Sequence, residues 1–491
     1  MSIFPADSSG RTERARAAQE VHMRQLSGVD ASFLHMEDSR MTGHVGGLII
    51  LDPSTAERPV DLETMKEYVA ARIPALPPLR WRLAEVPLGI DLPYWYDDHD
   101  VDLDFHVRSL ALPAPGNQQQ LIEQVSRIHA RPLDRAHPLW ELYVIEGLEG
   151  GKVAIYTKLH HAAIDGKAGR MILSTLLSPD PSCPAPQPPA EMPASETRPS
   201  EMEMLTRGWM GLLGHPGKSV ELMLKGAAEW QKSMQHFGYA ALGEARTKML
   251  DNPPVPAPRL SFNKSMTARR NWAYGTVPLS DVKKIKESLG CTINDVVMAI
   301  CAGALRQWLL DHDELPEAPL RAMVPVSIRT AEQADTAGNQ VSAMIAELPT
   351  HLTDPLARVE AVHASMSRAK EDFAALPAAL LQEFAQFAAP AAAELVARTA
   401  ASLRLADTVA LPFNLVISNV PGPREPLYYA GALMEANYPV SMISDGMGLN
   451  ITVQSYRDNM DFGLISCPEL IPDLERIIDY IVAEAAALAA V

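Results

Sequence analysis

The sequence predicts an α/β protein built as two sandwich domains, each with helices and strands in two layers. Three observations lead to this prediction. The chain has 491 residues, which is too long for a single hydrophobic core. Strand-like and helix-like patterns are mixed in both halves, as in layered α/β folds. A Pro-rich stretch, 179–199, separates the halves and has the composition of a linker.

The composition excludes several classes of function. Apolar residues make up 47% and charged residues 21%, as in ordinary globular proteins. The formal net charge of −17 disfavours nucleic-acid binding, because phosphate attraction requires a basic surface. The four cysteines form no C-x-x-C pair, so we expect neither a zinc site nor a disulfide framework, and a reduced cytoplasmic setting fits best.

Neither a targeting segment nor a membrane-spanning helix is expected. Residues 1–25 are rich in Arg and Glu and are predicted to be a flexible tail rather than a signal peptide. The most apolar stretch, 376–409, is interrupted by charged residues and falls short of the roughly 20 apolar residues of a span. A buried or amphipathic helix pair is expected there, and any membrane contact would be peripheral.

The first domain is expected at 26–178. It begins with a β-like run at 44–51 and a helix at 62–73, which prolines end. Alternating apolar residues predict an extended segment at 101–107, and 118–130 has helical spacing.

Two β runs then form a predicted hairpin, 141–147 and 152–159, joined by Gly150-Gly151. If the strand period continues, His161 lies on the face of Val153, Ile155, Thr157 and Leu159, and His160 lies on the opposite face. Gly166 ends the strand, and a helix is expected at 167–177.

A linker at 179–260, with mostly helical character at 202–250, leads to the second domain at 261–491. Thr292 is the expected N-cap of a long helix, and Asp295 completes a loose capping box. The expected strands are 271–278, 320–326, 341–348, 415–417, 449–456 and 460–466, and the expected helices are 280–289, 294–310, 356–373 and 472–490.

The stretch His160-His161-Ala162-Ala163-Ile164-Asp165-Gly166, at a strand end, carries the strongest chemical signal. An imidazole can take a proton from a hydroxyl near neutral pH, because its unperturbed pKa is about 6.5. The chain has no G-x-S-x-G, so no serine nucleophile is predicted. Consecutive histidines on opposite strand faces, without H-E-x-x-H, disfavour a metal site. A purely structural histidine at a turn remains the alternative.

These residues resemble the H-H-x-x-x-D-G motif of the CoA-dependent acyltransferase superfamily, which peptide-synthetase condensation domains share. Other segments narrow the resemblance to the bacterial wax ester synthase/diacylglycerol acyltransferases, from about residue 26 to the C-terminus. They are Phe33-Leu34, His44-Val45-Gly46-Gly47, Pro138-Leu139-Trp140, Asn294-Asp295, Ser418 to Pro423 and Gly448-Leu449-Asn450. Gly43-His44 stands where many members have Met-His, so His44 receives no catalytic role.

The resemblance implies a two-domain fold with the active site in a tunnel between the domains. It implies transfer of a fatty acyl group from acyl-CoA, a substrate rather than a cofactor, to the hydroxyl of diacylglycerol, or secondarily of a long-chain alcohol. His161 would be the general base, supported by His160. Asp165, next to Gly166, would be structural and would pair with Arg329.

The resemblance also places Asn294, Asp295, Ser418, Asn419 and Trp140 at the substrate. Each has a plainer interpretation. Asn294 and Asp295 suit the first turn of a helix, where acidic side chains favour the dipole. Ser418-Asn419 precedes a rigid Pro-Gly-Pro turn, and Trp140 at a strand start suits a core.

Two other functions stay open, namely a condensation-type or polyketide-modifying acyltransferase with a carrier-protein donor, and a non-catalytic lipid-binding relative. The water-insoluble products suggest a peripheral position at the cytoplasmic membrane face or on lipid droplets. The amphipathic part of 202–250 is the candidate anchor. Acceptor preference, acyl chain length and oligomeric state are left open by the sequence.

Overall fold

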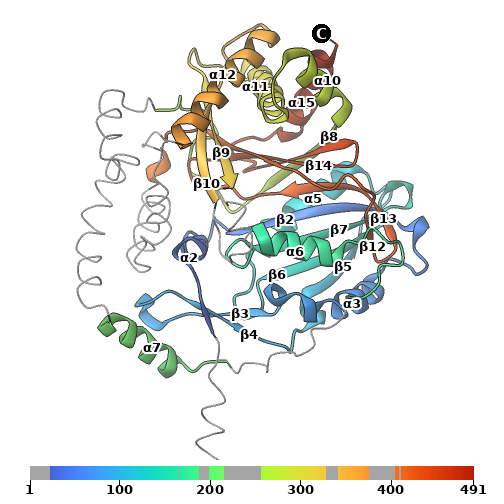
Figure 1. Cartoon of the computed structure of the whole chain (residues 1–491), viewed down its shortest axis with the longest axis vertical. Coiled ribbons are helices and arrows are strands. Elements are labelled where there is room, and N and C mark those ends of the chain that lie inside the picture. Colours follow the sequence, from blue (N-terminus) through green and yellow to red (C-terminus); the bar gives the residue numbers. More distant parts are fainter. Residues whose placement is uncertain are drawn as a thin grey trace, which may run out of the picture.

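The computed structural model describes residues 23–164, 166–186, 198–214, 256–327, 341–374, 404–407 and 411–490. Two lobes of mixed α and β structure are visible in Figure 1. A six-stranded sheet forms the centre of each lobe, and a three-stranded sheet accompanies the first. The predicted mixed α/β fold is confirmed.

The strands and helices have the following bounds. The first sheet has the order β12 (Tyr428–Tyr429), β13 (Ala432–Val440), β2 (His44–Asp52), β7 (Val153–His160), β6 (Trp140–Glu146), β5 (Val107–Ala111). The second has the order β10 (Val341–Leu348), β9 (Leu320–Ser327), β11 (Leu415–Val420), β14 (Leu449–Tyr456), β15 (Asn459–Ser466), β8 (Asn271–Pro278). The small sheet is β1 (Arg24–Gln25), β4 (Tyr94–Asp97), β3 (Trp81–Ala84). The helices are α2 (Gly28–His35), α3 (Leu62–Ala70), α4 (Leu103–His106), α5 (Gln118–His129), α6 (Gly166–Leu176), α7 (Glu201–Gly214), α10 (Leu279–Leu289), α11 (Ile293–Asp311), α12 (Pro355–Ala374) and α15 (Leu474–Ala489).

The hairpin that leads to the two histidines is present. Strands β6 and β7 pair antiparallel, with Trp140 opposite Leu159. The turn between them contains Gly150 and Gly151, both with positive φ, which glycine adopts without a steric penalty. On β7, Ile155 packs in one apolar cluster and Tyr156 in another, so both faces of the strand are covered. The strand is therefore held rigidly up to its last residue.

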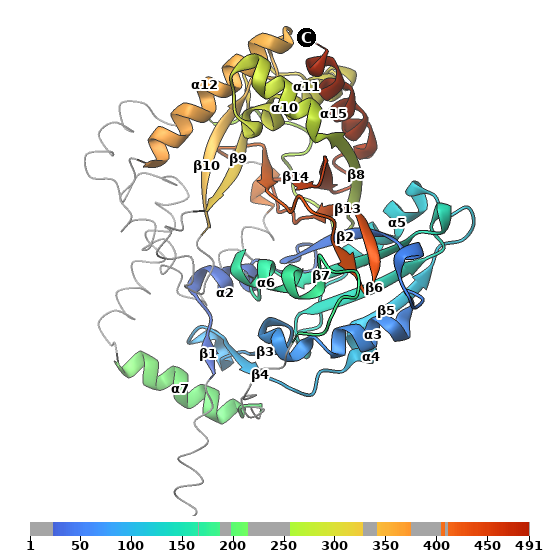
Figure 2. The same ribbon diagram turned by 45° about the vertical axis from the view of Figure 1, so that its right-hand side comes forward.

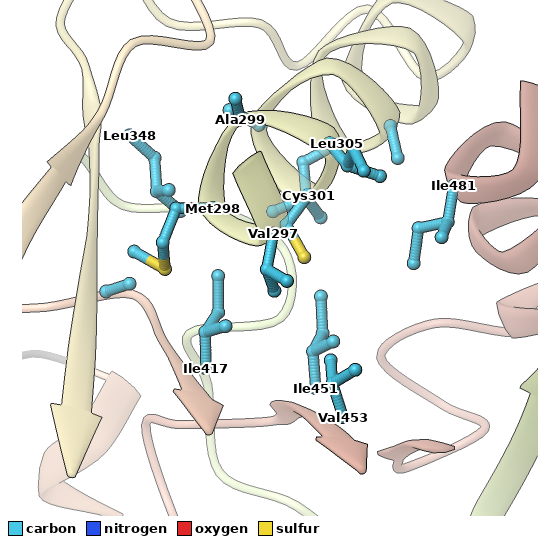
Figure 3. Packing of buried hydrophobic residues seen from close by; sticks show 14 of the residues in the cluster. Val297, Met298, Ala299, Cys301, Leu305, Leu348, Ile417, Ile451, Val453 and Ile481 are labelled. Atoms are coloured by element: carbon cyan, nitrogen blue, oxygen red, sulfur yellow. The ribbon is translucent and has the colours of Figure 1, made fainter. Parts of the chain in front are cut away.

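In the second lobe, helices α10, α11, α12 and α15 lie on one face of the sheet (Figure 2). Helix α11 packs Val297 and Cys301 towards strand residues Ile417 and Ile451 (Figure 3). Among the described helices, only α11 has the length and hydropathy of a membrane span. The structure buries 72% of that window, as expected for a core helix. Each large apolar side chain buried in this way contributes about 1.5–3 kcal/mol.

The chain crosses between the lobes. Strands β12 and β13 follow most of the second sheet in sequence but join the first sheet, where β13 pairs antiparallel with β2. The indole N–H of Trp272, on β8, donates to the carbonyl oxygen of Pro439 on β13 at 3.2 Å. Strand pairing between distant segments is not visible in local patterns, so this exchange between the halves could not be predicted from the sequence.

One predicted element is wrong. The alternation at 101–107 predicted an extended segment, but Leu103–His106 is a helical turn and the strand starts at Val107. The carboxylate of Asp102 accepts the amide hydrogens of Asp104 and Phe105 at 2.9 and 3.2 Å, and this cap favours the helical turn. Of the predicted tail at 1–25, residues 1–22 lie outside the described residues, and Arg24–Gln25 forms β1, which pairs with β4. Of the predicted helical segments, 215–250 and 376–403 also lie outside the described residues.

Candidate active site

The two histidines lie where β7 ends. His160 is the last residue of the strand, and its N–H donates to the carbonyl oxygen of Leu139 at 2.9 Å. His161 follows in a turn, and its N–H donates to the carbonyl oxygen of Gly43 at 2.9 Å. The amide of Ala163 then closes the turn on the carbonyl oxygen of His160 at 3.0 Å. The backbone of the pair is therefore fixed from two neighbouring strand ends.

His160 points into the protein. Its side chain is buried, like those of Ala154, Tyr156 and Lys158, which alternate with it on β7. Its Nδ1 accepts the N–H of Ala162 at 3.1 Å. Its Nε2 lies 3.1 Å from Oε1 of Glu37. Both ring nitrogens thus face protein groups inside the fold, which suits a supporting role better than a role at the substrate.

His161 has a different setting. Its ring is half-buried and stacks on the ring of Phe33, with centroids 4.1 Å apart and planes 17° apart. Burial disfavours the charged imidazolium and lowers the pKa of His161 to about 4. The ring is therefore neutral at physiological pH and able to accept a proton.

His44 lies in the protein core. It faces His160 across the β2–β7 pairing and is completely buried. Its Nε2–H donates to the carbonyl oxygen of His129 at 2.6 Å, and the two rings meet edge to face. Burial lowers the pKa of His44 well below its usual value. Its contacts are those of a core residue.

The predicted capping box of α11 is present in the second lobe. The hydroxyl of Thr292 accepts the N–H of Asp295 at 3.2 Å, and the Asp295 carboxylate accepts the N–H of Thr292 at 2.9 Å. The same oxygen of buried Asp295 lies 2.8 Å from Nδ1 of His363, on α12. The carboxylate is engaged within its own lobe, and its predicted substrate contact stays a prediction.

Asn294 meets the segment that precedes the Pro-Gly-Pro turn. The side-chain amide of Asn419 donates to Oδ1 of Asn294 at 3.5 Å, and both side chains are half-buried. Ser418 and Asn419 lie on β11, which pairs parallel with β14. Two of the sequence blocks singled out above are therefore joined, through an amide–amide contact.

Family comparison identifies the chain. Residues 26–297 match the wax ester synthase/diacylglycerol acyltransferase catalytic domain, and residues 337–489 match the C-terminal domain of the same family. The chain belongs to this family. A probable diacylglycerol O-acyltransferase of Mycobacterium tuberculosis is 38% identical over 455 residues, which cover 92% of this chain and 96% of the relative. The O-acyltransferase WSD of Acinetobacter baylyi is 33% identical over 461 residues, or 94% and 95% of the two chains.

Solved structures support the assignment of this acyltransferase. The wax ester synthase/diacylglycerol acyltransferase of Marinobacter aquaeolei matches with a TM-score of 0.65 and 31% identity, over 95% of this chain and all of that one. A condensation domain of the calcium-dependent antibiotic synthetase matches with a TM-score of 0.55 over 96% and 97% of the two chains. At 15% identity that likeness concerns the fold alone.

Several predicted site residues of the acyltransferase remain untested. Asp165 and Arg329 lie outside the described residues, so their predicted pairing stays a prediction, and Gly166 is the first residue of α6. Trp140 is buried, and its indole N–H donates to the carbonyl oxygen of Leu79 at 2.8 Å, which is the core setting of its plainer interpretation. Within the described residues, no group of three or more His, Cys, Asp or Glu side chains could hold a metal ion.

The sequence reasoning missed two contacts of the histidine pair. Phe33 was noted only as part of a family block, and Glu37 received no role. Both lie around the end of α2, far from the motif in the chain, and both contact it. An acidic residue between a short helix and a strand is too common a pattern to have revealed this contact.

Proposed function

We propose that this acyltransferase moves a fatty acyl group from the thioester of acyl-CoA to the hydroxyl of diacylglycerol, and more slowly to that of a long-chain alcohol. The observation that carries the proposal is the His161 imidazole, neutral and half-buried at the end of β7. Relatives that cover nearly the whole chain and are named diacylglycerol O-acyltransferase support diacylglycerol as the first acceptor.

In the proposed reaction His161 takes the proton of the acceptor hydroxyl. The alkoxide oxygen attacks the thioester carbonyl carbon, and a new C–O bond forms. The tetrahedral intermediate collapses, the C–S bond breaks, and the CoA sulfur leaves with the proton returned from the imidazolium. No covalent acyl-enzyme is needed. Base catalysis of this kind contributes about 10² to 10⁴ in rate, and positioning of the two substrates contributes the rest.

The acceptor is tested by incubating the purified chain with labelled palmitoyl-CoA and either dioleoylglycerol or hexadecanol. We expect labelled triacylglycerol to form faster than wax ester. A third arm offers palmitoyl-acyl-carrier protein as donor, which a condensation-type enzyme would prefer. CoA release that does not depend on either acceptor, or preference for the carrier-bound donor, would contradict the proposal.

We also propose that α7 rests on a lipid surface, at the cytoplasmic face of the membrane or on a lipid droplet. The inner side of α7 is held at Gly208, where an added Cβ would lie 2.9 Å from Ile90. Large apolar side chains remain exposed on and beside the helix, namely Leu88 at 83%, Met202 at 72% and Trp209 at 56%. Insertion of such groups into the lipid interface is favourable and largely independent of salt.

Flotation with phosphatidylcholine vesicles that contain diacylglycerol tests this contact. The triple variant Leu88→Asn, Met202→Ser, Trp209→Ser should remain in the pellet while the wild type floats; Asn tolerates the positive φ of position 88. The matched control, Leu289→Ser with Leu310→Ser, removes exposed apolar groups from the second lobe and should float. A triple variant that floats like the wild type would argue against α7 as the contact.

A further inference from the structure

A buried carboxylate outside the histidine motif joins the elements that hold it. Glu37 follows α2, and its side chain is 13% exposed. Oε1 accepts the N–H of Gly43 at 2.8 Å and lies 3.1 Å from Nε2 of His160. Oε2 accepts from the guanidinium of Arg135 at 2.9 Å. Each oxygen of the carboxylate therefore has a donor.

The contacts of His160 indicate its tautomer. Because Nδ1 of His160 accepts the Ala162 amide, the ring proton of the neutral imidazole lies on Nε2, the nitrogen that is 3.1 Å from Oε1 of Glu37. Burial alone would raise the pKa of Glu37, but the interaction with His160 and the hydrogen bonds from Gly43 and Arg135 outweigh it and lower the pKa to about 2. Glu37 is thus ionised at every pH at which the protein would be assayed.

Glu37 is also connected, through Gly43, to the proposed base His161. The carbonyl oxygen of Gly43 accepts the N–H of His161, while the N–H of Gly43 is bound by Glu37. There is no space for a side chain at Gly43, because an added Cβ would lie 2.6 Å from the carbonyl oxygen of Phe33 and 2.9 Å from Nε2 of His160. Phe33 in turn stacks on the ring of His161. Glu37 therefore holds the ring of one histidine and, through Gly43, the backbone of the other.

We propose that Glu37 is a positioning residue of the acyl transfer, which fixes the Nε2–H tautomer of His160 and thereby the turn that presents His161. The inference rests on the proposed role of His161 as base. Its basis is the two contacts of one carboxylate oxygen, with the N–H of Gly43 and with Nε2 of His160, while Arg135 binds the other oxygen. In Glu37→Gln the amide can accept on one side only, so either His160 or Arg135 faces an N–H donor instead of an acceptor. Loss of a carboxylate that orients a histidine costs about 10- to 100-fold in metal sites, and we expect a loss of the same order here.

The test compares Glu37→Gln with Glu85→Gln. Glu85 is the matched control, because its carboxylate accepts from the same Arg135 guanidinium at 2.7 Å but is not the carboxylate beside His160. We expect Glu37→Gln to lower kcat by about 10- to 100-fold with KM for palmitoyl-CoA within about three-fold. Glu85→Gln should keep kcat within about two-fold. Wild-type kcat in Glu37→Gln would overturn the inference.

A second variant separates positioning from a general loss of folded protein. His160→Asn keeps an acceptor for Ala162 but loses the Nε2–H bond, so it should lower kcat like Glu37→Gln and carry the test if the latter does not fold. In the His160→Asn background, Glu37→Gln should add less than about two-fold, because the shared contact is already broken. A full additional loss, or wild-type kcat in His160→Asn, would overturn the inference. His161→Ala is measured alongside. If His161→Ala retains activity, the role of His161 as base is refuted. If His161→Ala is inactive but Glu37→Gln is fully active, only the role of Glu37 is refuted.

Discussion

The low pKa of His161 predicts an unusual pH dependence of turnover. Because burial lowers the pKa of this base to about 4, the base stays neutral far into the acid range. An ordinary imidazole would lose its activity as the pH falls through about 6.5. The free enzyme should therefore keep nearly constant kcat/KM between about pH 8 and about pH 5.

The two possible pKa values of the base predict clearly different activities in acid. At about pH 5, a base with a pKa of about 4 is roughly 90% neutral, and a base with a pKa of about 6.5 is roughly 3% neutral. The expected kcat/KM at that pH thus differs about 30-fold between the two cases. Phe33→Ala should expose the stacked face of the ring to water, which moves the pKa of His161 upwards and brings the loss of activity to higher pH.

The assay is initial-rate CoA release at low palmitoyl-CoA across the pH range, with circular dichroism at each pH to show that the protein is folded. Asp461→Asn is the control, because burial raises the pKa of Asp461 to about 6 and its titration could imitate a catalytic limb. A loss of kcat/KM as the pH falls through about 6.5 that persists in Asp461→Asn would contradict the lowered pKa of His161.

Three further outcomes follow from the contacts. Gly43→Ala should lower the stability by about 1–3 kcal/mol and remove most of the activity. Gly47→Ala is the control, because its added Cβ would meet Asn437 only at an ordinary 3.4 Å, and it should be close to wild type in thermal melting and turnover. Asp295→Ala should lower the free energy of unfolding in urea by about 1–3 kcal/mol, because it removes the capping box and a buried hydrogen bond. His363→Ala should lower it by less than about 1 kcal/mol, because the His363 side chain is half-exposed. Equal losses in the two variants would contradict the capping role of Asp295. The raised pKa of Asp461 means that the fold binds its proton more tightly than the unfolded chain, so the stability due to this proton is present below about pH 4 and is lost as the pH rises through about 6. The melting temperature of the wild type relative to Asp461→Asn should therefore fall from about pH 4.5 to about pH 7.5, and a constant difference would refute the sign.

Local patterns predicted most elements, because hydrophobic periodicity and caps are local properties. The hairpin before His160, the capping box at Thr292 and the two strands that follow Gly448, β14 and β15, all appear where local patterns predicted them. The short helix at Leu103–His106 was missed because a side-chain cap on two amides outweighed an alternating pattern.

What the sequence could not predict depends on pairing over long distances. The addition of β13 to the first sheet is a contact between segments on opposite sides of the linker. Glu37 and His160 lie in the same half of the chain but far apart in sequence, and their proximity follows only once β2 lies beside β7. Strand parity predicted only that His160 lies on the face opposite Leu159, and the structure buries that side chain. Parity says nothing beyond the strand end, where Phe33 stacks on the ring of His161.

The most direct test of the account is single-turnover acyl transfer by the His161→Ala variant, with labelled palmitoyl-CoA and dioleoylglycerol at concentrations that saturate the wild type. We expect the rate of triacylglycerol formation to fall by a factor of about 10² to 10⁴ relative to the wild type. The variant should still melt cooperatively and bind palmitoyl-CoA. Triacylglycerol formation at the wild-type rate in this variant would contradict the assignment of His161 as the base.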